Sequence, residues 1–247
     1  MSDRIFAIGD LHLSFSQEKP MGVFGENWED HHLKIEENWR ASVADDDIVF
    51  IPGDISWALK LEDALSDLAW LHALPGTKVL LRGNHDYWWN SVSKLRELYD
   101  SLRFIQNDSM DVGNAVLCGT RGWLTPEDVH YNAEDDEKIF KRELIRLRIS
   151  LESAARTAIA KIAKDGSGET TGETVVPIIC GLHFPPTGGG SMSEFTTMFE
   201  EFGVTKVVYG HLHGKESYGK GIKGVYGGVS YSLVSADYID FNPIQIL

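Results

Sequence analysis

Basic residues are scarce in this chain. Its 247 residues include 23 lysines and arginines against 37 aspartates and glutamates, which gives a net charge of −14. Non-specific binding to nucleic acids depends on clustered basic side chains, so this charge argues against a nucleic-acid partner. A small anionic substrate stays compatible with the acidic surface, because a bound metal ion can reverse the local field.

Long apolar runs and cysteines are also scarce. No segment approaches the ~20 apolar residues that span a bilayer, which excludes a membrane-spanning protein. The first residues, MSDRIFAIGD, show neither the basic segment nor the cleavage site of a secretory signal. Cys118 and Cys180 both lie in apolar runs, as is typical of reduced core thiols. We therefore expect a cytoplasmic protein without a membrane partner, and the sequence leaves its oligomeric state open.

What the chain does contain is an alternation of strand-like and helical segments. Runs rich in Val, Ile and Phe predict strands at 4–9, 47–52, 77–82, 115–119, 175–181 and 205–209. Apolar residues three and four apart predict helices at 31–44, 57–74 and 134–164. The tail beyond residue 222 alternates glycine with Val, Tyr and Ile, which predicts closing strands. This pattern predicts an α/β layered fold, and because no linker interrupts it, we expect one domain over residues 1–247.

Acidic, amide and imidazole side chains follow five of the predicted strands. These residues are Asp10 and His12 in FAIGDLH, Asp54 in VFIPGDIS, Asn84, His85 and Asp86 in VLLRGNHD, His183 in IICGLHFPP, and His211 and His213 in VVYGHLH. In layered α/β sheets the carboxyl ends of the strands meet at one crevice, where ligands bind. The five segments therefore predict one shared site.

The donor types in these segments indicate metal binding. Carboxylate and amide oxygens with imidazole nitrogens, and no cysteine, suit Mn, Fe, Zn, Ni or Mg. Their number exceeds what one tetrahedral ion needs, so we expect two divalent ions. A single Gly-Asp after a strand is usually only a turn, and His31, His32, His72 and His130 are interpreted as surface or packing histidines. The five segments together are not explained by turns.

The order of the segments resembles that of the calcineurin-like metallophosphoesterases, and the resemblance runs from Asp10 to His213. It implies a four-layer αββα sandwich, in which two mixed sheets lie face to face and helices flank them. It also implies a ligand set: Asp10, His12 and His213 for the first ion, Asn84, His183 and His211 for the second, and Asp54 bridging both. His85 would face the substrate, and Asp86 would hold the His85 ring.

One segment departs from many members of this family. Where they continue Gly-Asp with a second acid and an arginine-glycine pair, this chain has GDISWAL, which we expect to enter a helix directly at Trp57. The departure leaves the ligand set intact but leaves the substrate class open.

The resemblance implies a metal-dependent phosphohydrolase that cleaves a small phosphoester. A metal-bridging hydroxide would attack the phosphorus, and His85 would protonate the leaving group as general acid. A phosphodiesterase or nuclease acting on cyclic nucleotides or nucleic acid is the alternative. A non-catalytic scaffold is disfavoured, because all the expected ligands are kept. Arg121 is a candidate phosphate contact, with an ordinary ion pair as the competing interpretation.

Overall fold

Eleven strands form two mixed sheets in the computed structural model, which describes residues 4–17, 19–165, 175–190 and 192–247. The first sheet has the order β11 (Ile244–Gln245), β1 (Ile5–Ala7), β2 (Ile48–Ile51), β3 (Thr77–Leu80) and β4 (Leu102–Phe104). The second has the order β5 (Ser109–Asp111), β6 (Val116–Thr120), β7 (Ile178–Leu182), β8 (Val204–Tyr209), β10 (Val229–Leu233) and β9 (Gly224–Tyr226). All neighbouring pairs are parallel except those of the edge strands β11, β5 and β9.

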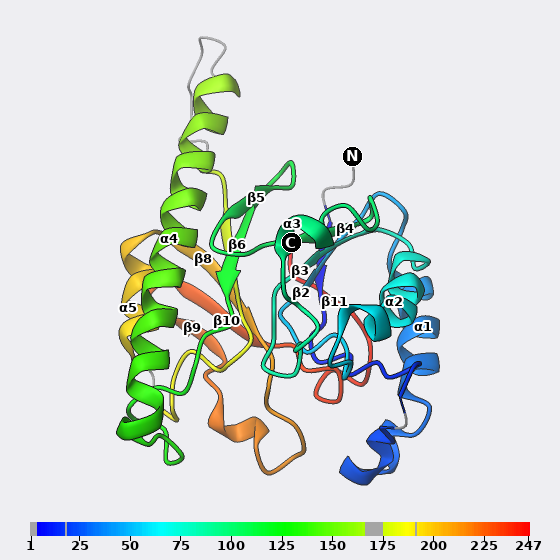
Figure 1. Cartoon of the computed structure of the whole chain (residues 1–247). Helices are drawn as coiled ribbons and strands as arrows, with labels where there is room; N and C mark the ends of the chain where they lie inside the picture. Colours follow the sequence, from blue (N-terminus) through cyan, green and yellow to red (C-terminus); the bar gives the residue numbers. More distant parts are fainter. Residues whose placement is uncertain (1–3, 18, 166–174, 191) are drawn as a thin grey trace.

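Helices cover the outer face of each sheet (Figure 1). The helices α1 (His31–Ser42) and α2 (Leu61–His72) pack on the first sheet, and α4 (Ala133–Asp165) and α5 (Glu194–Glu201) pack on the second. Shorter helical turns are α3 (Val92–Leu95), η1 (Met21–Phe24), η2 (Glu26–Trp28) and η3 (Tyr218–Lys220). A third apolar cluster, which includes Phe50, Val79, Leu117 and Val208, lies between the sheets. This arrangement confirms the αββα sandwich.

The six strands and three helices predicted from apolar patterns are all present, although their ends shift by a few residues. The strands β4 and β5 were not predicted, because runs of three residues carry no usable pattern, whereas β9, β10 and β11 lie in the tail where closing strands are expected. The prediction of a helix from Trp57 is wrong, since α2 begins at Leu61. The Trp57 N–H instead donates to the Leu13 carbonyl at 2.9 Å, which keeps this segment extended.

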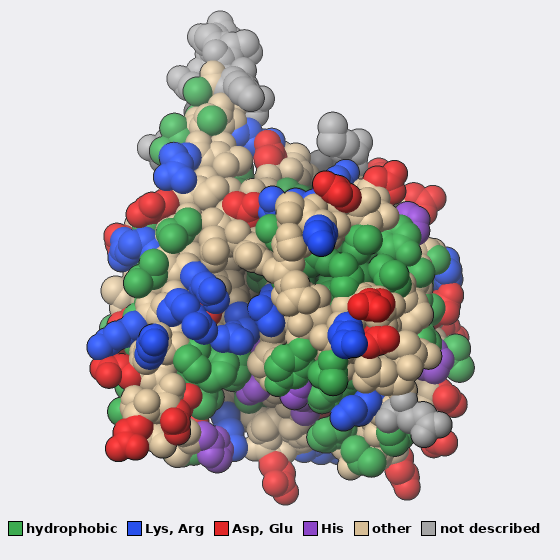
Figure 2. Space-filling view, in the orientation of Figure 1, with side chains coloured by type: hydrophobic (Ala, Val, Ile, Leu, Met, Phe, Trp, Pro, Cys, Tyr) green, Lys and Arg blue, Asp and Glu red, His purple; other side chains and the backbone are tan. Residues whose placement is uncertain are grey.

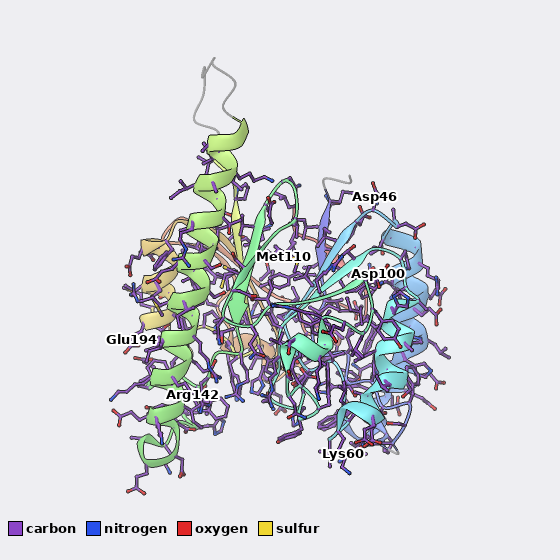
Figure 3. All side chains as sticks on the ribbon, turned by 45° about the horizontal axis from the view of Figure 1, so that its top comes forward. Asp46, Lys60, Asp100, Met110, Arg142 and Glu194 are labelled. Atoms are coloured by element: carbon purple, nitrogen blue, oxygen red, sulfur yellow. The ribbon has the colours of Figure 1, made fainter. Side chains whose placement is uncertain are left out.

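Helix α2 packs on the first sheet through one face. Ala64, Leu68 and Leu71 face the core, whereas Leu65 is 39% exposed. Figure 3 shows α2, which follows Lys60, on the opposite side of the molecule from Arg142 of α4.

The cysteines and the apolar content agree with a protein that has an ordinary buried core. Cys118 and Cys180 are buried free thiols, as predicted. None of the helices in the described part of the chain has the length and apolar character to cross a membrane. Acidic side chains are scattered over the face shown in Figure 2, while lysine and arginine side chains gather beside a hollow near its centre.

Candidate metal centre

The predicted donor residues lie in loops that leave the carboxyl ends of five parallel strands. Asp10 and His12 follow β1, Asp54 follows β2, and Asn84 follows β3 in the first sheet. The remaining donors, His183, His211 and His213, follow β7 and β8 in the second sheet. The two sheets are joined beside these loops by a hydrogen bond of 2.7 Å from Gly9 N to the Val234 carbonyl. The fold therefore brings both sets of loops to one place.

Four of these residues adopt left-handed backbone conformations. The φ angles are 58° at Asp10, 45° at His12, 53° at Asp54 and 73° at His211. Such angles are uncommon for residues other than glycine, and each costs of order 1–3 kcal/mol when a functional site holds it. Four such residues surround one point. Their conformational cost is accepted because it orients these side chains toward each other.

Two glycines allow the carboxylates of Asp54 and Asp10 to approach the backbone closely. A Cβ atom on Gly83 would overlap the backbone nitrogen and carboxylate of Asp54, and one on Gly210 would overlap the carboxylate of Asp10. Because the overlapping atoms include backbone or a fully buried side chain, neither site has space for alanine. The glycines preceding Asn84 and His211 are thus required by close approach.

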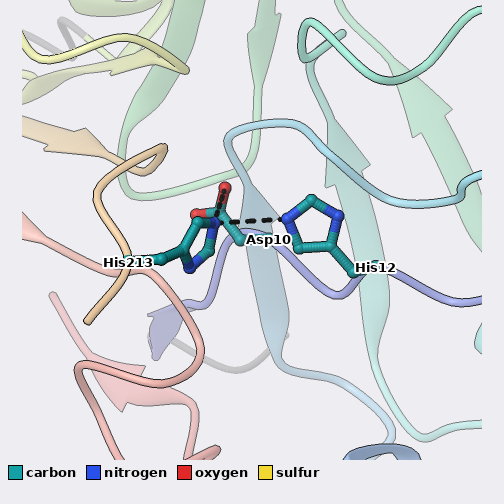
Figure 4. Close-up of side chains that lie close together, drawn as sticks. All are labelled: Asp10, His12 and His213. Atoms are coloured by element: carbon teal, nitrogen blue, oxygen red, sulfur yellow. Dashed lines mark hydrogen bonds and ion pairs between the residues drawn. The ribbon is translucent and has the colours of Figure 1, made fainter. Parts of the chain in front are cut away.

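Asp10, His12 and His213 form the first group of donors (Figure 4). The Nε2 atoms of His12 and His213 lie 3.2 Å apart, and His213 Nε2 lies 3.5 Å from Asp10 Oδ1. Two ring nitrogens that face each other need a proton or a cation between them, because two lone pairs repel. The Nδ1 atom of His12 is buried with no hydrogen-bond partner among the described residues. This set fits a divalent ion with nitrogen and oxygen ligands.

Asn84, His183 and His211 form the second group. Asn84 Oδ1 lies 2.6 Å from His183 Nε2 and 3.1 Å from His211 Nδ1, and these two nitrogens are 3.3 Å apart. On its other side, His183 Nδ1 lies 3.1 Å from the Pro52 carbonyl, which can only accept. The proton of His183 is therefore on Nδ1, and the Nε2 lone pair is left for a metal ion.

Asp54 lies between the two groups. Its Oδ2 atom is 3.8 Å from His12 Nε2 and 3.4 Å from His183 Nε2. Its Oδ1 atom accepts a hydrogen bond of 2.8 Å from the His85 backbone N–H. One oxygen thus faces both groups while the other is fixed by the β3 loop, which is the position that a bridging ligand needs.

Without a metal ion, the histidines of the site differ in their pKa values. Burial lowers the pKa of His183 to about 3 and that of His211 to about 4, so both imidazoles are neutral at neutral pH. Burial acts in the same direction on His213, but hydrogen bonds and charges of Asp10 and Asp237 outweigh it and raise its pKa to about 10. Burial, followed by the charges of Asp86 and Asp10, raises the pKa of Asp54 well above its usual value. A proton on His213 therefore occupies the site when no cation does.

Asp237 is a site residue that sequence reasoning missed. Its Oδ1 atom lies 2.9 Å from His213 Nδ1, and its Oδ2 atom accepts hydrogen bonds from Gly214 N at 2.9 Å and Tyr218 Oη at 2.8 Å. A carboxylate behind a ligand histidine fixes the ring and increases the basicity of its other nitrogen. The only signal in the sequence is that Asp237 follows strand β10, without a neighbouring glycine or histidine.

We expect the affinity for a divalent ion to rise with pH and to depend on Asp237. A metal ion needs neutral His213, so it must displace the proton that a pKa of about 10 keeps on the ring, and affinity rises about tenfold per pH unit for each proton released. In Asp237→Asn the pKa of His213 falls and the rise becomes shallower. Calorimetric titration with Mn²⁺ from pH 6 to 8 measures the slope. Equal slopes in both proteins would show that Asp237 does not control this proton.

His85 faces a pocket of about 160 Å³, which also includes Met21, Phe24 and Trp57 in its wall. The His85 and Trp57 ring centroids are 4.2 Å apart, and His85 lies 5.8 Å from the His12 ring. Burial lowers the pKa of His85 below its usual value. The ring is half-buried, next to the first donor group, and open to a bound molecule.

Asp86 does not hold the His85 ring, and the predicted role is corrected here. Its carboxylate accepts five hydrogen bonds of 2.7–3.2 Å, from the backbone N–H groups of Asp54, Ile55, Ser56 and Gly83 and from Trp88 Nε1. These donors use both oxygens of a fully buried group. Asp86 therefore ties the β3 loop to the β2 loop and so positions Asp54.

Because Asp86 satisfies buried amides, its loss should reduce stability as well as activity. We expect Asp86→Asn to lower the free energy of unfolding by about 2–4 kcal/mol. The NH₂ group of the asparagine side chain would face backbone N–H donors, which it cannot accept from. Urea unfolding of the metal-free proteins measures this, with the exposed Asp100→Asn as control. Unchanged stability would mean that the loop amides find other partners.

Arg121 is not brought into the pocket that His85 lines. It forms the wall of a separate cavity, where its Nη2 atom lies 3.7 Å from the buried carboxylate of Glu143. Two tryptophans that follow β3, Trp88 and Trp89, are buried in the first core, while Trp57 lies beside the histidines.

A sandwich of two sheets with carboxylates and imidazoles gathered between the strand ends is the architecture of a metallophosphoesterase. A model of the calcineurin-like phosphoesterases matches residues 3–215. The chain belongs to this family, whose members are metal-dependent phosphoesterases.

Two curated relatives each match less than a third of the chain. The Gene 66 protein of Mycobacterium phage L5 is 32% identical over 77 residues, which are 31% of this chain and 37% of the phage protein. The Gene 66 protein of Mycobacterium phage D29 is 44% identical over 73 residues, which are 28% of this chain and 36% of that protein. The matches span little more than a third of each relative's length, so they say nothing about a shared activity.

Solved structures of similar fold cover almost the whole chain. TT1561 of Thermus thermophilus has a TM-score of 0.50 and 15% identity, covering 98% of this chain and 97% of that one. The phosphopantetheinyl hydrolase PptH from Mycobacterium tuberculosis has a TM-score of 0.49 and 15% identity, covering 99% and 95%. At this identity the likeness concerns the fold alone.

Proposed function

We propose that the protein is a binuclear metal-dependent phosphohydrolase that acts on a small phosphoester. The observation that carries this proposal is the arrangement of two pairs of facing imidazole nitrogens, 3.2 Å and 3.3 Å apart, on either side of Asp54. Asp10, His12 and His213 would hold one ion, Asn84, His183 and His211 the other, and Asp54 both. Such ions, when bound, supply Lewis acidity toward phosphoryl oxygens and lower the pKa of water.

Residues of the chain itself would attract the substrate and protonate the leaving group. Asp54 and Asp10 bring two negative charges to a site that would hold four positive ones, so an anionic phosphoester is attracted despite the acidic surface. His85 faces the pocket and would give a proton to the leaving oxygen, while Trp57 packs against its ring. The pocket volume of about 160 Å³ favours a small substrate over a nucleic-acid strand.

Because the candidate ligands come from both sheets, we propose that residues 1–247 work as one domain. The buried free thiols support the predicted cytoplasmic location.

Removal of metal tests the proposal directly. Dialysis against a chelator should abolish hydrolysis of phosphate monoesters, and Mn²⁺ should restore it, with two ions bound per chain by elemental analysis. Calcium should restore it poorly, because it prefers more ligands and all-oxygen sites. Parallel assays of monoesters, diesters and cyclic nucleotides identify the substrate class. Undiminished hydrolysis by the chelated protein would contradict the metal-dependent mechanism.

A further inference from the structure

Four arginines surround a cavity of about 370 Å³ that is distinct from the pocket lined by His85. They come from three separate parts of the fold: Arg82 after β3, Arg121 after β6, and Arg142 and Arg146 on α4. We call this cavity the arginine pocket. Arg142 is labelled on the amino-terminal half of α4 in Figure 3.

The arginine pocket holds an excess of positive charge. Glu143 is the acidic residue in its wall, and Arg146 pairs with it at 2.7 Å, whereas Arg142 and Arg121 approach it only to 3.7 Å. Glu143 also accepts a hydrogen bond of 2.7 Å from Thr120 Oγ1. Four arginines thus line a cavity whose wall holds one carboxylate, in a chain whose net charge is −14. Charge of this sign attracts an oxyanion into the cavity.

Arg121 is prepared to bind such an anion. Its Nε atom is buried and has no hydrogen-bond partner among the described residues. Its guanidinium carbon lies 4.6 Å from the centre of the Trp123 ring, which restricts the orientation of the fork. Buried donors normally have an acceptor, and a planar guanidinium matches the spacing of phosphate oxygens.

The arginine pocket is built on the same loops as the candidate metal centre. Arg82 lies two residues before Asn84, and the Arg121 carbonyl accepts hydrogen bonds from the N–H groups of His183 at 3.0 Å and Phe184 at 2.9 Å. The Phe184 ring in turn lies 4.1 Å from the ring of His211. Figure 2 shows the clustered basic side chains beside the hollow and histidine side chains on the same face.

We propose that the arginine pocket binds a second phosphate group of the substrate whose phosphoester is cleaved at the metal centre. The inference rests on the proposed function and deepens it: the substrate class is a small molecule that carries two phosphate groups. The pocket lined by His85, which we call the histidine pocket, positions the ester that reacts, and the arginines select molecules with a further anionic group at the right separation.

Binding of inorganic pyrophosphate to the chelator-treated protein tests the pocket itself. Calorimetry should show binding that weakens about 10- to 100-fold in the double variant Arg82→Gln/Arg142→Gln, because charge-assisted hydrogen bonds are lost. Arg146 is left in place to keep Glu143 paired. The control is Arg156→Gln, an exposed position on the same helix outside the pocket, which should bind like the wild type. Equal binding by all three proteins would overturn the proposal, because it would show an adventitious ion only.

Hydrolysis by the Mn²⁺-loaded protein tests the link to the substrate. Butane-, hexane- and octanediol bisphosphates are compared with the matching alkyl monophosphates. We expect at least one bisphosphate to have a kcat/KM about tenfold or more above that of its monophosphate, and the double variant to lose this preference. If none of the three bisphosphates is hydrolysed better than its monophosphate although pyrophosphate binds, the arginine pocket binds a separate anion and the proposal fails. If neither substrate type is hydrolysed, the proposed function itself fails.

Discussion

Replacing Asp54 with alanine should remove both metal ions and lower phosphomonoester hydrolysis by more than about 10³-fold. The reason is its place between the groups, with Oδ2 3.8 Å from His12 Nε2 and 3.4 Å from His183 Nε2. No other carboxylate in the described chain pairs with both of these ring nitrogens. Elemental analysis after loading and dialysis, together with kcat at saturating substrate, measures both effects.

Two further variants separate a bridging role from a general loss of structure. His12→Ala should affect mainly the first ion, because His12 belongs to one group only. Asp46→Ala, an exposed acid at the opposite end of β2, should keep both ions and full activity. Retention of two ions per chain in Asp54→Ala would exclude the bridging role. A protein that loses its secondary structure by circular dichroism would instead place Asp54 in folding, so spectra accompany each metal analysis.

The donor residues were predictable because each of them comes shortly after the end of a predicted strand. Asp10, Asn84 and His211 closely follow apolar segments in the sequence, and the carboxyl ends of parallel strands lie at the same edge of a sheet. The sequence could not show which side chains those donors contact. From the sequence, Asp86 looks like a partner for its neighbour His85. In the structure it accepts hydrogen bonds from backbone N–H groups of a loop about thirty residues earlier. Every residue type except proline has a backbone N–H, so the sequence gives no sign of these bonds.

Residues contributed by distant segments were the least predictable. Asp237 reaches His213 because β10 lies parallel to β8, so that both strands end at the same edge of the sheet, a pairing that the apolar pattern does not specify. The arginine pocket depends on where α4 crosses the end of β6, so Arg121 was visible as a candidate phosphate contact but its cavity was not. The extended segment before α2 was missed for the same reason, since Leu13 and Trp57 are far apart in sequence.

The second large effect is expected at His85. It lines the histidine pocket, yet no hydrogen bond to its ring is present among the described residues, so the ring is available to a leaving group. We expect His85→Asn to keep both metal ions and to lower kcat about 10²–10⁴-fold, because protonation of the leaving oxygen is lost. His130→Asn, an exposed histidine outside the pocket, is the matched control and should leave kcat and metal content unchanged.

The dependence on the leaving group distinguishes an acid from a phosphate-binding residue. Nitrophenolate departs without much protonation, so His85→Asn should slow nitrophenyl phosphate less than an alkyl phosphate. The sign of the pH effect follows from the lowered pKa of His85: the active imidazolium is present below that pKa and is lost as pH rises through it. The wild-type kcat for the alkyl ester should therefore fall on the alkaline side, and this limb should disappear in His85→Asn. If the variant loses an ion, His85 is a ligand; if both esters slow equally, it binds phosphate instead of donating a proton.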